Sequence, residues 1–131
     1  MPLSRRDSIG KLYHVLTFEA PAPIAAAAGQ FAMVRSAAWG HAPLLPRPMS
    51  LLTAGVRPSI LIKVVGDGTR RLSLAGSGEP FELLAPLGRP WSAPADGERP
   101  VLVAGGVGIA PLFRRSLDRG GRRSGDRHRS R

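Results

Sequence analysis

Glycine and proline divide this chain into short segments. The sequence has 16 Gly and 13 Pro among 131 residues. Between them lie short apolar or alternating runs, which predict strands at 11–18, 30–35, 49–53, 59–65 and 80–85. One short helix is predicted at 69–75, with Thr69 as its N-cap. Short strands joined by turns, with one short helix, predict a mainly β fold: a small antiparallel barrel or sandwich.

The pattern changes after residue 94. Residues 94–100 are predicted to form a linker, and 101–104 is a continuous apolar run that leads into the glycine-rich segment 105–111. A buried parallel strand that enters a turn and then a helix has this pattern. We therefore expect a barrel at 1–95 and the first strand and glycine turn of an incomplete α/β nucleotide-binding domain at 96–113. A basic, disordered tail is expected at 114–131.

The positive charge is concentrated in that tail. The formal net charge is +10, and residues 114–131 contribute +6 of it through eight Arg and two Asp. One alternative function is therefore a nucleic-acid-binding module with a basic arm. The barrel segment, however, lacks the interleaved aromatic and basic residues of single-strand binders, so nucleic acid is a disfavoured partner. No apolar run approaches the ~20 residues of a membrane span, and the N-terminus lacks a secretory signal. We expect no membrane association and a cytoplasmic location.

The chain contains no cysteine. This excludes disulfides, thiolate nucleophiles, Cys-ligated zinc and a Cys-held iron–sulfur cluster within these residues. No His lies at ligand spacing from a carboxylate, so no metal site is predicted.

Three motifs point to anion or nucleotide binding. In residues 47–50, an Arg at the end of a loop is followed by a rigid Pro, and its guanidinium suits a diphosphate. In residues 64–69, a strand ends in two glycines and a Thr before a helix, whose free N–H groups favour phosphate. Residues 105–111 approach the dinucleotide-binding fingerprint, with Pro111 in place of the last glycine. A surface Arg before a turn, a plain capped helix and a glycine-rich bend remain the alternatives.

Together and in this order, the motifs resemble the ferredoxin–NADP reductase superfamily. Within it, the likeness is greatest to the electron-transfer subunit of the two-subunit bacterial dihydroorotate dehydrogenases. It rests on residues 28–33, 43–50, 63–69, 85–88 and 105–111. The resemblance implies a Greek-key FAD-binding barrel followed by a nicotinamide-binding domain. The cofactor-binding residues that it implies are Arg47, Pro48, Met49, Ser50, Leu61, Ile62, Lys63, Gly68, Thr69, Gly105, Gly106, Gly108 and Pro111.

The resemblance also implies roles. Arg47 would bind the FAD diphosphate, Ser50 would lie beside the flavin ring, and Gly68 and Thr69 would present backbone and hydroxyl groups to the phosphates. In the family, NADH reduces FAD, and electrons pass through a [2Fe–2S] cluster to the catalytic dihydroorotate dehydrogenase subunit, the expected partner. No catalytic side chain is assigned, because the cofactor carries the chemistry.

The sequence departs from the family in two ways that limit this expectation. The nicotinamide domain stops after one strand and turn, so the NAD(H) site is expected to be incomplete. Without cysteine there is no iron–sulfur cluster, so the full oxidoreductase reaction is not expected of this chain alone. The tail composition is typical of a natural truncation with an unrelated end or of out-of-frame translation. Two further alternatives are a reductase fragment of another system in the superfamily and a truncated product that binds nothing.

Overall fold

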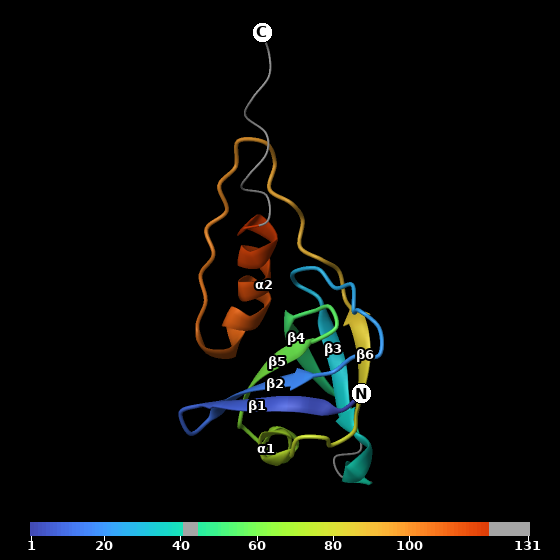
Figure 1. The fold of residues 1–131 in the computed structure, drawn as a ribbon. Coiled ribbons are helices and arrows are strands. Elements are labelled where there is room, and N and C mark those ends of the chain that lie inside the picture. Colours follow the sequence, from blue (N-terminus) through green and yellow to red (C-terminus); the bar gives the residue numbers. More distant parts are fainter. Residues whose placement is uncertain (41–44, 121–131) are drawn as a thin grey trace.

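Six antiparallel strands form one sheet in the order β1-β2-β5-β4-β3-β6 (Figure 1). The computed structural model describes residues 1–40 and 45–120. The mainly β fold predicted from the sequence is confirmed. The strands are β1 (Leu3–Ile9), β2 (Tyr13–Phe18), β3 (Phe31–Ser36), β4 (Arg47–Thr53), β5 (Ser59–Lys63) and β6 (Phe81–Leu87). The helices are η1 (Ala37–Trp39), α1 (Asp67–Leu74), η2 (Gly106–Gly108) and α2 (Ile109–Gly120).

The strand order makes this sheet a Greek key. Strands β3, β4 and β5 are consecutive neighbours, and β6 returns to lie beside β3. The two edges then meet, because the Phe81 N–H donates to the Met1 carbonyl at 2.8 Å and the Leu3 N–H donates to the Glu79 carbonyl at 2.9 Å. These bonds close the sheet into a barrel.

The barrel interior is filled by alternate residues of the strands. Leu16 and Phe18 of β2 and Ile60 and Ile62 of β5 are at most 1% exposed. Phe81 packs edge-on against Phe18, with ring centroids 5.3 Å apart. This period-two burial is what the alternating segments predict.

Strand β1 was not predicted, because its sequence lacks an apolar alternation. Leu3 is buried, whereas most of the later side chains of β1 are exposed. Arg5 and Asp7 form a salt bridge of 2.7 Å on its exposed surface. Charged side chains are common on edge strands, where they discourage pairing with other chains. Pairing with β2, and not an apolar periodicity of its own sequence, therefore keeps β1 in the sheet.

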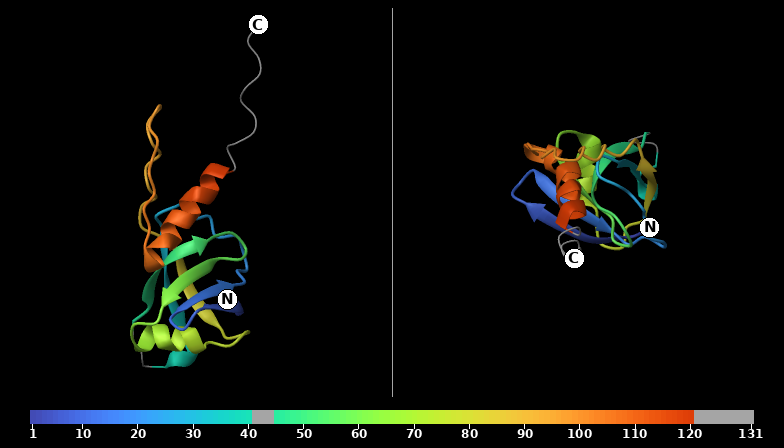
Figure 2. Two further views of the ribbon diagram at one scale, coloured as in Figure 1. Left: turned by 90° about the vertical axis from the view of Figure 1, so that its left-hand side faces the viewer. Right: turned by 90° about the horizontal axis from the view of Figure 1, so that it is seen from above.

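Residues 88–105 extend away from the barrel beside α2 and return to η2 (Figure 2). The strand predicted at 101–104 is not formed: Val101 and Val103 are each 85% exposed. A strand needs a neighbour for its backbone hydrogen bonds, and no described residue supplies one here. The predicted tail at 114–131 is not disordered at its start, because α2 continues through Gly120. Leu and Arg favour helix, which accounts for this extension.

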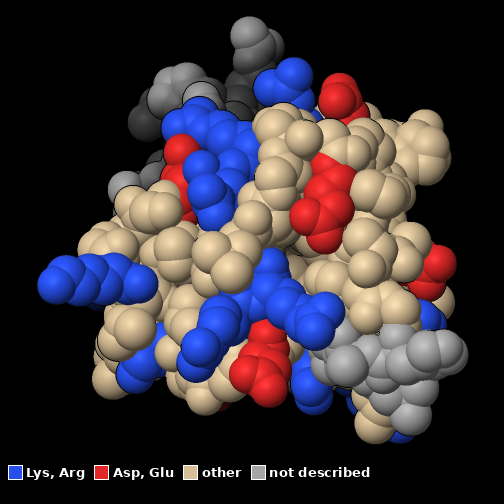
Figure 3. Space-filling view, turned by 90° about the horizontal axis from the view of Figure 1, so that it is seen from below, with Lys and Arg blue, Asp and Glu red and all other residues tan. Residues whose placement is uncertain are grey.

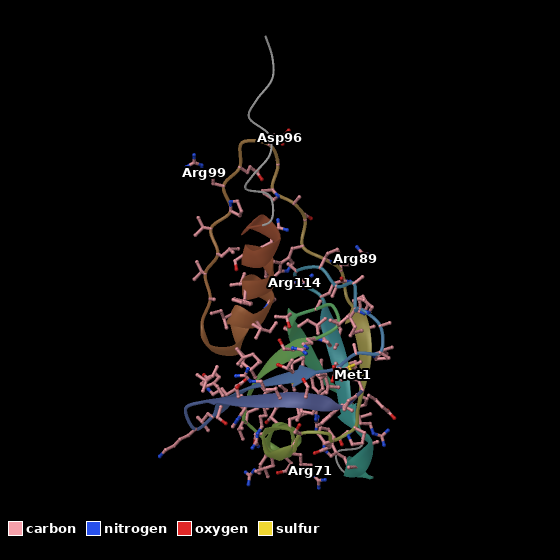
Figure 4. All side chains as sticks on the ribbon, viewed as in Figure 1. Met1, Arg71, Arg89, Asp96, Arg99 and Arg114 are labelled. Carbon is pink, nitrogen blue, oxygen red and sulfur yellow. The ribbon has the colours of Figure 1, made fainter. Side chains whose placement is uncertain are left out.

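Helix α2 is held against the barrel at its first half. It packs against β4, and Ala110 is buried. The Arg114 guanidinium, which lies between α2 and the barrel in Figure 4, donates to the Ala26 carbonyl at 2.7 Å. Arg115 donates to the Ser92 carbonyl at 3.0 Å. The glycine-rich segment is therefore fixed beside the sheet. Within the described residues, no helix is long and apolar enough to cross a membrane.

The segment before β3 and the segment after β6 contact each other through a glycine. Gly29 has a φ of +93°, and a Cβ there would lie 2.6 Å from Cδ1 of Trp91. The backbone N–H of Trp91 donates to the Ala28 carbonyl at 2.9 Å. Any side chain at residue 29 would meet both a backbone penalty and the indole ring. Trp91 therefore packs at the rim of the barrel.

Candidate functional site

The three sequence motifs come together at one end of the barrel. Strands β4 and β5 are antiparallel, with Leu51 opposite Ile60, so β4 begins at the end where β5 finishes. Helix α1 follows β5 and packs against it, and η2 also contacts β5. Elements that are distant in sequence thereby place Arg47, Lys63, Gly68 and the glycine turn on the same part of the surface.

Arg47 lies directly against the first turn of α1. A Cβ at Gly68 would be only 2.5 Å from the Arg47 Nε, so the absence of a side chain at residue 68 makes room for this guanidinium. Gly68 is buried and Arg47 is half-buried. Among the described residues, the Arg47 side chain forms neither a salt bridge nor a hydrogen bond. The Arg47 side chain is thus positioned by packing while its donors stay available.

The first turn of α1 presents backbone N–H groups beside this guanidinium. The N-cap is Gly66, not the predicted Thr69, which is the third residue of the helix. The Thr69 hydroxyl accepts from the Val65 N–H at 2.9 Å and donates to the Gly66 carbonyl at 3.0 Å. Its proton is therefore committed within the turn. The N–H groups at the start of the helix have no intrahelical acceptor and, with the helix dipole, favour an anion.

Thr69→Ala should lower the free energy of unfolding by about 1 kcal/mol, because the Val65 and Gly66 N–H groups lose their acceptor. Urea denaturation measures this change. Thr69→Ser keeps the hydroxyl and should retain most of the stability. Equal losses in the two variants would show that the Thr69 methyl group, and not the hydroxyl, stabilises the turn.

The two faces of β5 separate the residues that were predicted to line the cofactor. Ile62 is 1% exposed and its side chain belongs to the core, so only its backbone is available to the outer surface. Leu61 and Lys63 are half-buried on the opposite face. The Lys63 Nζ lies 5.7 Å from the centroid of the Tyr13 ring. Lys63 forms no salt bridge with any residue that the structure describes.

The residues after Arg47 alternate in the same way. Met49 packs against the core, whereas Pro48 is exposed. Ser50 is half-buried and lies opposite Phe31 of β3. Of the predicted residues of β4, Arg47 and Ser50 offer polar groups outside the core.

The glycine turn has one position that requires glycine. Gly106 has a φ of +55°, whereas Gly105 and Gly108 have ordinary φ values and open space where a Cβ would be. Pro111 is the third residue of α2 and lies in the first turn, where a missing N–H costs no helical bond. His41 and His128 lie outside the described residues.

Charges of both signs occur on the surface at the α1 end. Figure 3 shows Asp and Glu side chains between the Lys and Arg side chains on this face, so the positive surface is interrupted. No three His, Asp or Glu side chains in residues 1–40 and 45–120 lie close enough together to hold a metal ion. The groups at this end that can bind a ligand are therefore the cations Arg47 and Lys63 and the N–H groups of the first turn of α1.

Similar proteins were found by sequence and by structure. The chain is 39% identical over 105 residues to the dihydroorotate dehydrogenase B (NAD(+)) electron transfer subunit of Desulforamulus reducens, covering 76% of this chain and 39% of that protein. The subunit of the same name from Clostridium acetobutylicum is 38% identical over 85 residues, which is 64% of this chain and 34% of that protein. The chain thus spans about four tenths or less of the length of these relatives. No protein-family model matches it.

The fold has a solved counterpart in an NADH-dependent reduced ferredoxin–NADP oxidoreductase, described for its flavin-based electron bifurcation. The TM-score is 0.76 and the sequence identity 27%, over 92% of this chain and 44% of that one. The barrel is of the ferredoxin–NADP reductase type. The resemblance predicted from the sequence is thereby confirmed, both for this fold and for the likeness to the dihydroorotate dehydrogenase electron-transfer subunits.

Two residues of this ferredoxin–NADP reductase-type barrel were not singled out from the sequence. Tyr13, the only Tyr of the chain, lies beside Lys63 and near Gly106. Arg114, which was assigned to the tail, attaches α2 to the loop before β3. Both roles depend on contacts between distant segments, so no local pattern marks them.

Proposed function

We propose that this chain binds FAD at the α1 end of the barrel and transfers electrons within a dihydroorotate dehydrogenase of the two-subunit type. One observation carries the proposal: Arg47 and Lys63, neither with a carboxylate partner among the described residues, lie at the same end as the first turn of α1. The Arg47 guanidinium and a helix N-terminus suit the diphosphate of a dinucleotide, and Lys63 adds a cation for its flavin end. Because Gly68 has no side chain, the Arg47 guanidinium lies directly beside the first turn of α1, so one diphosphate can contact both.

Each residue has a role in this proposal. Arg47 and the backbone N–H groups of Gly68 and Thr69 hold the diphosphate. Ser50 lies beside the flavin ring, and Leu61 and Lys63 contact it from β5, while Ile62 contributes its backbone. Bound FAD supplies the hydride-accepting and electron-transferring chemistry, so the protein needs to bind and orient it.

The glycine turn is proposed to begin the nicotinamide site. Gly105, Gly106, Gly108 and Pro111 lie next to β4 and β5, where a second dinucleotide would meet the flavin. The catalytic dihydroorotate dehydrogenase subunit is the proposed partner. Because these 131 residues include no Cys, none of them can ligate an iron–sulfur cluster through a thiolate.

The experiment is a titration of the purified chain with FAD, followed by absorbance and by flavin fluorescence. Wild-type protein should bind FAD, and Arg47→Ala should weaken binding by about 10- to 100-fold, the loss of a charge-assisted hydrogen-bonding pair. Arg57→Ala is the matched control, since Arg57 is an exposed cation in the turn at the other end of β4 and β5. A chain that does not take up FAD, or equal effects of the two Arg variants, would refute the proposal.

A further inference from the structure

Tyr13 lies where the barrel meets the glycine turn. It is the first residue of β2 and is directly opposite Lys63 of β5 in the register. The Lys63 Nζ is 5.7 Å from the centroid of its ring, a distance at which a cation is attracted to the ring face. The Tyr13 hydroxyl is 3.5 Å from the position of a Cβ at Gly106. The ring is therefore held between a strand neighbour and the turn.

The surroundings of Tyr13 form a partly apolar outer surface. Val15 is opposite Leu61 in the same register, and both are half-buried. Leu16 and Ile62, which follow them in the alternation, point into the core. Tyr13, Val15, Leu61 and Lys63 thus share one face of β2 and β5. Flat apolar area with one cation suits a ligand that is planar, aromatic and negatively charged.

We infer that Tyr13 is a flavin-binding residue whose ring contacts the isoalloxazine of the bound FAD. This inference rests on the proposed function and extends it to a residue on a third strand. The isoalloxazine has to face both the barrel and the nicotinamide to accept a hydride, and Tyr13 is next to both β5 and the glycine turn. Lys63 fixes the ring from one side, so the contact is formed at little entropic cost.

A phenol ring in contact with isoalloxazine has a spectroscopic signature. After excitation of the flavin, one electron passes from the phenol to the excited ring and returns, which quenches fluorescence without net oxidation. Phenylalanine has the same shape but does not donate this electron. The fluorescence lifetime of bound FAD therefore distinguishes contact with Tyr13 from a role in barrel stability.

The test compares wild-type chain with Tyr13→Phe and Tyr13→Leu, each titrated with FAD and measured for the lifetime of the bound flavin. We expect Tyr13→Phe to bind FAD nearly as wild type does, with a severalfold longer lifetime. Tyr13→Leu should also lengthen the lifetime and weaken binding by about two- to tenfold, the loss of one aromatic contact. Ile9→Ala is the matched control, because Ile9 is opposite Tyr13 on β1 and 56% exposed but carries no phenol.

Two outcomes would overturn the inference separately from the proposed function. Bound FAD with the same lifetime in wild type and Tyr13→Phe would show that the ring does not touch the isoalloxazine. Weaker binding by Tyr13→Leu without a lifetime change would assign Tyr13 to another part of the dinucleotide. A wild-type chain that does not bind FAD would refute the proposed function, and this inference with it.

Discussion

Gly68→Ala should weaken FAD binding by about 100-fold while the barrel remains as stable as before. The added methyl group would occupy the place of the Arg47 Nε, which is 2.5 Å from the Cβ position. Arg47 is a flexible side chain and can move away, so the folded state is not strained. The substitution instead lowers the affinity for FAD, because the diphosphate loses its charge-assisted pair with Arg47 and part of its interaction with the helix N-terminus.

Gly68→Ala should lower the affinity for FAD without lowering the stability of the barrel, and this combination distinguishes loss of the site from partial unfolding. Ala favours helix over Gly by about 0.5–1 kcal/mol, so thermal unfolding should occur at an equal or higher temperature. FAD titration of the same sample should show the loss of affinity. Gly66→Ala is the control, because a Cβ at residue 66 meets nothing within 4 Å. Equal loss of affinity in both variants would mean that displacement of Arg47 is not the cause.

Phe81→Ala should lower the free energy of unfolding by about 3–5 kcal/mol, enough to unfold a small domain of marginal stability. The Phe81 ring is 1% exposed and packs against Phe18 and Trp39, with ring centroids 5.3 and 6.2 Å away. Removal of this ring leaves a cavity that two other rings border. Urea denaturation followed by Trp fluorescence measures the loss.

Leu84→Ala provides the comparison on the same strand. Leu84 is 65% exposed, so its truncation should change the free energy of unfolding by less than about 0.5 kcal/mol. A small effect of Phe81→Ala, or a large effect of Leu84→Ala, would contradict the assignment of the inner face of β6.

The sequence predicts the five strands that carry an apolar pattern and misses β1, which has none. Segments 30–35 and 59–65 become β3 and β5 because apolar residues recur along them and fill the core. Strand β1 has one buried residue and is held by hydrogen bonds to β2, which no local pattern reveals. Residues 101–104 show the reverse case: they have the composition of a buried strand, yet no described strand lies beside them.

The candidate site likewise contains residues that a local pattern predicts and residues whose positions depend on the tertiary fold. Arg47, Gly68 and the glycine turn were predicted because turns and helix starts have local signatures. The inward orientation of Ile62 depends on the register of β5, and a shift of one residue would have exchanged the faces. The position of Tyr13 beside Lys63 depends on the pairing of strands whose residues are 50 positions apart in the numbering. Such contacts are decided by the tertiary fold.

The closure of the barrel between its first and sixth strands also bears on how fast the chain folds. The Met1 amino group and the Phe81 carbonyl are 80 residues apart in sequence, yet they form a hydrogen bond of 2.6 Å. Bringing such distant segments together costs chain entropy, and the contacts between them stabilise the chain only after this loop has closed. The β1–β2 hairpin can form from near neighbours, whereas the joining of β1 to β6 has to wait for most of the chain. The barrel therefore belongs with the β topologies that fold in milliseconds to seconds, and not with the fast helical bundles.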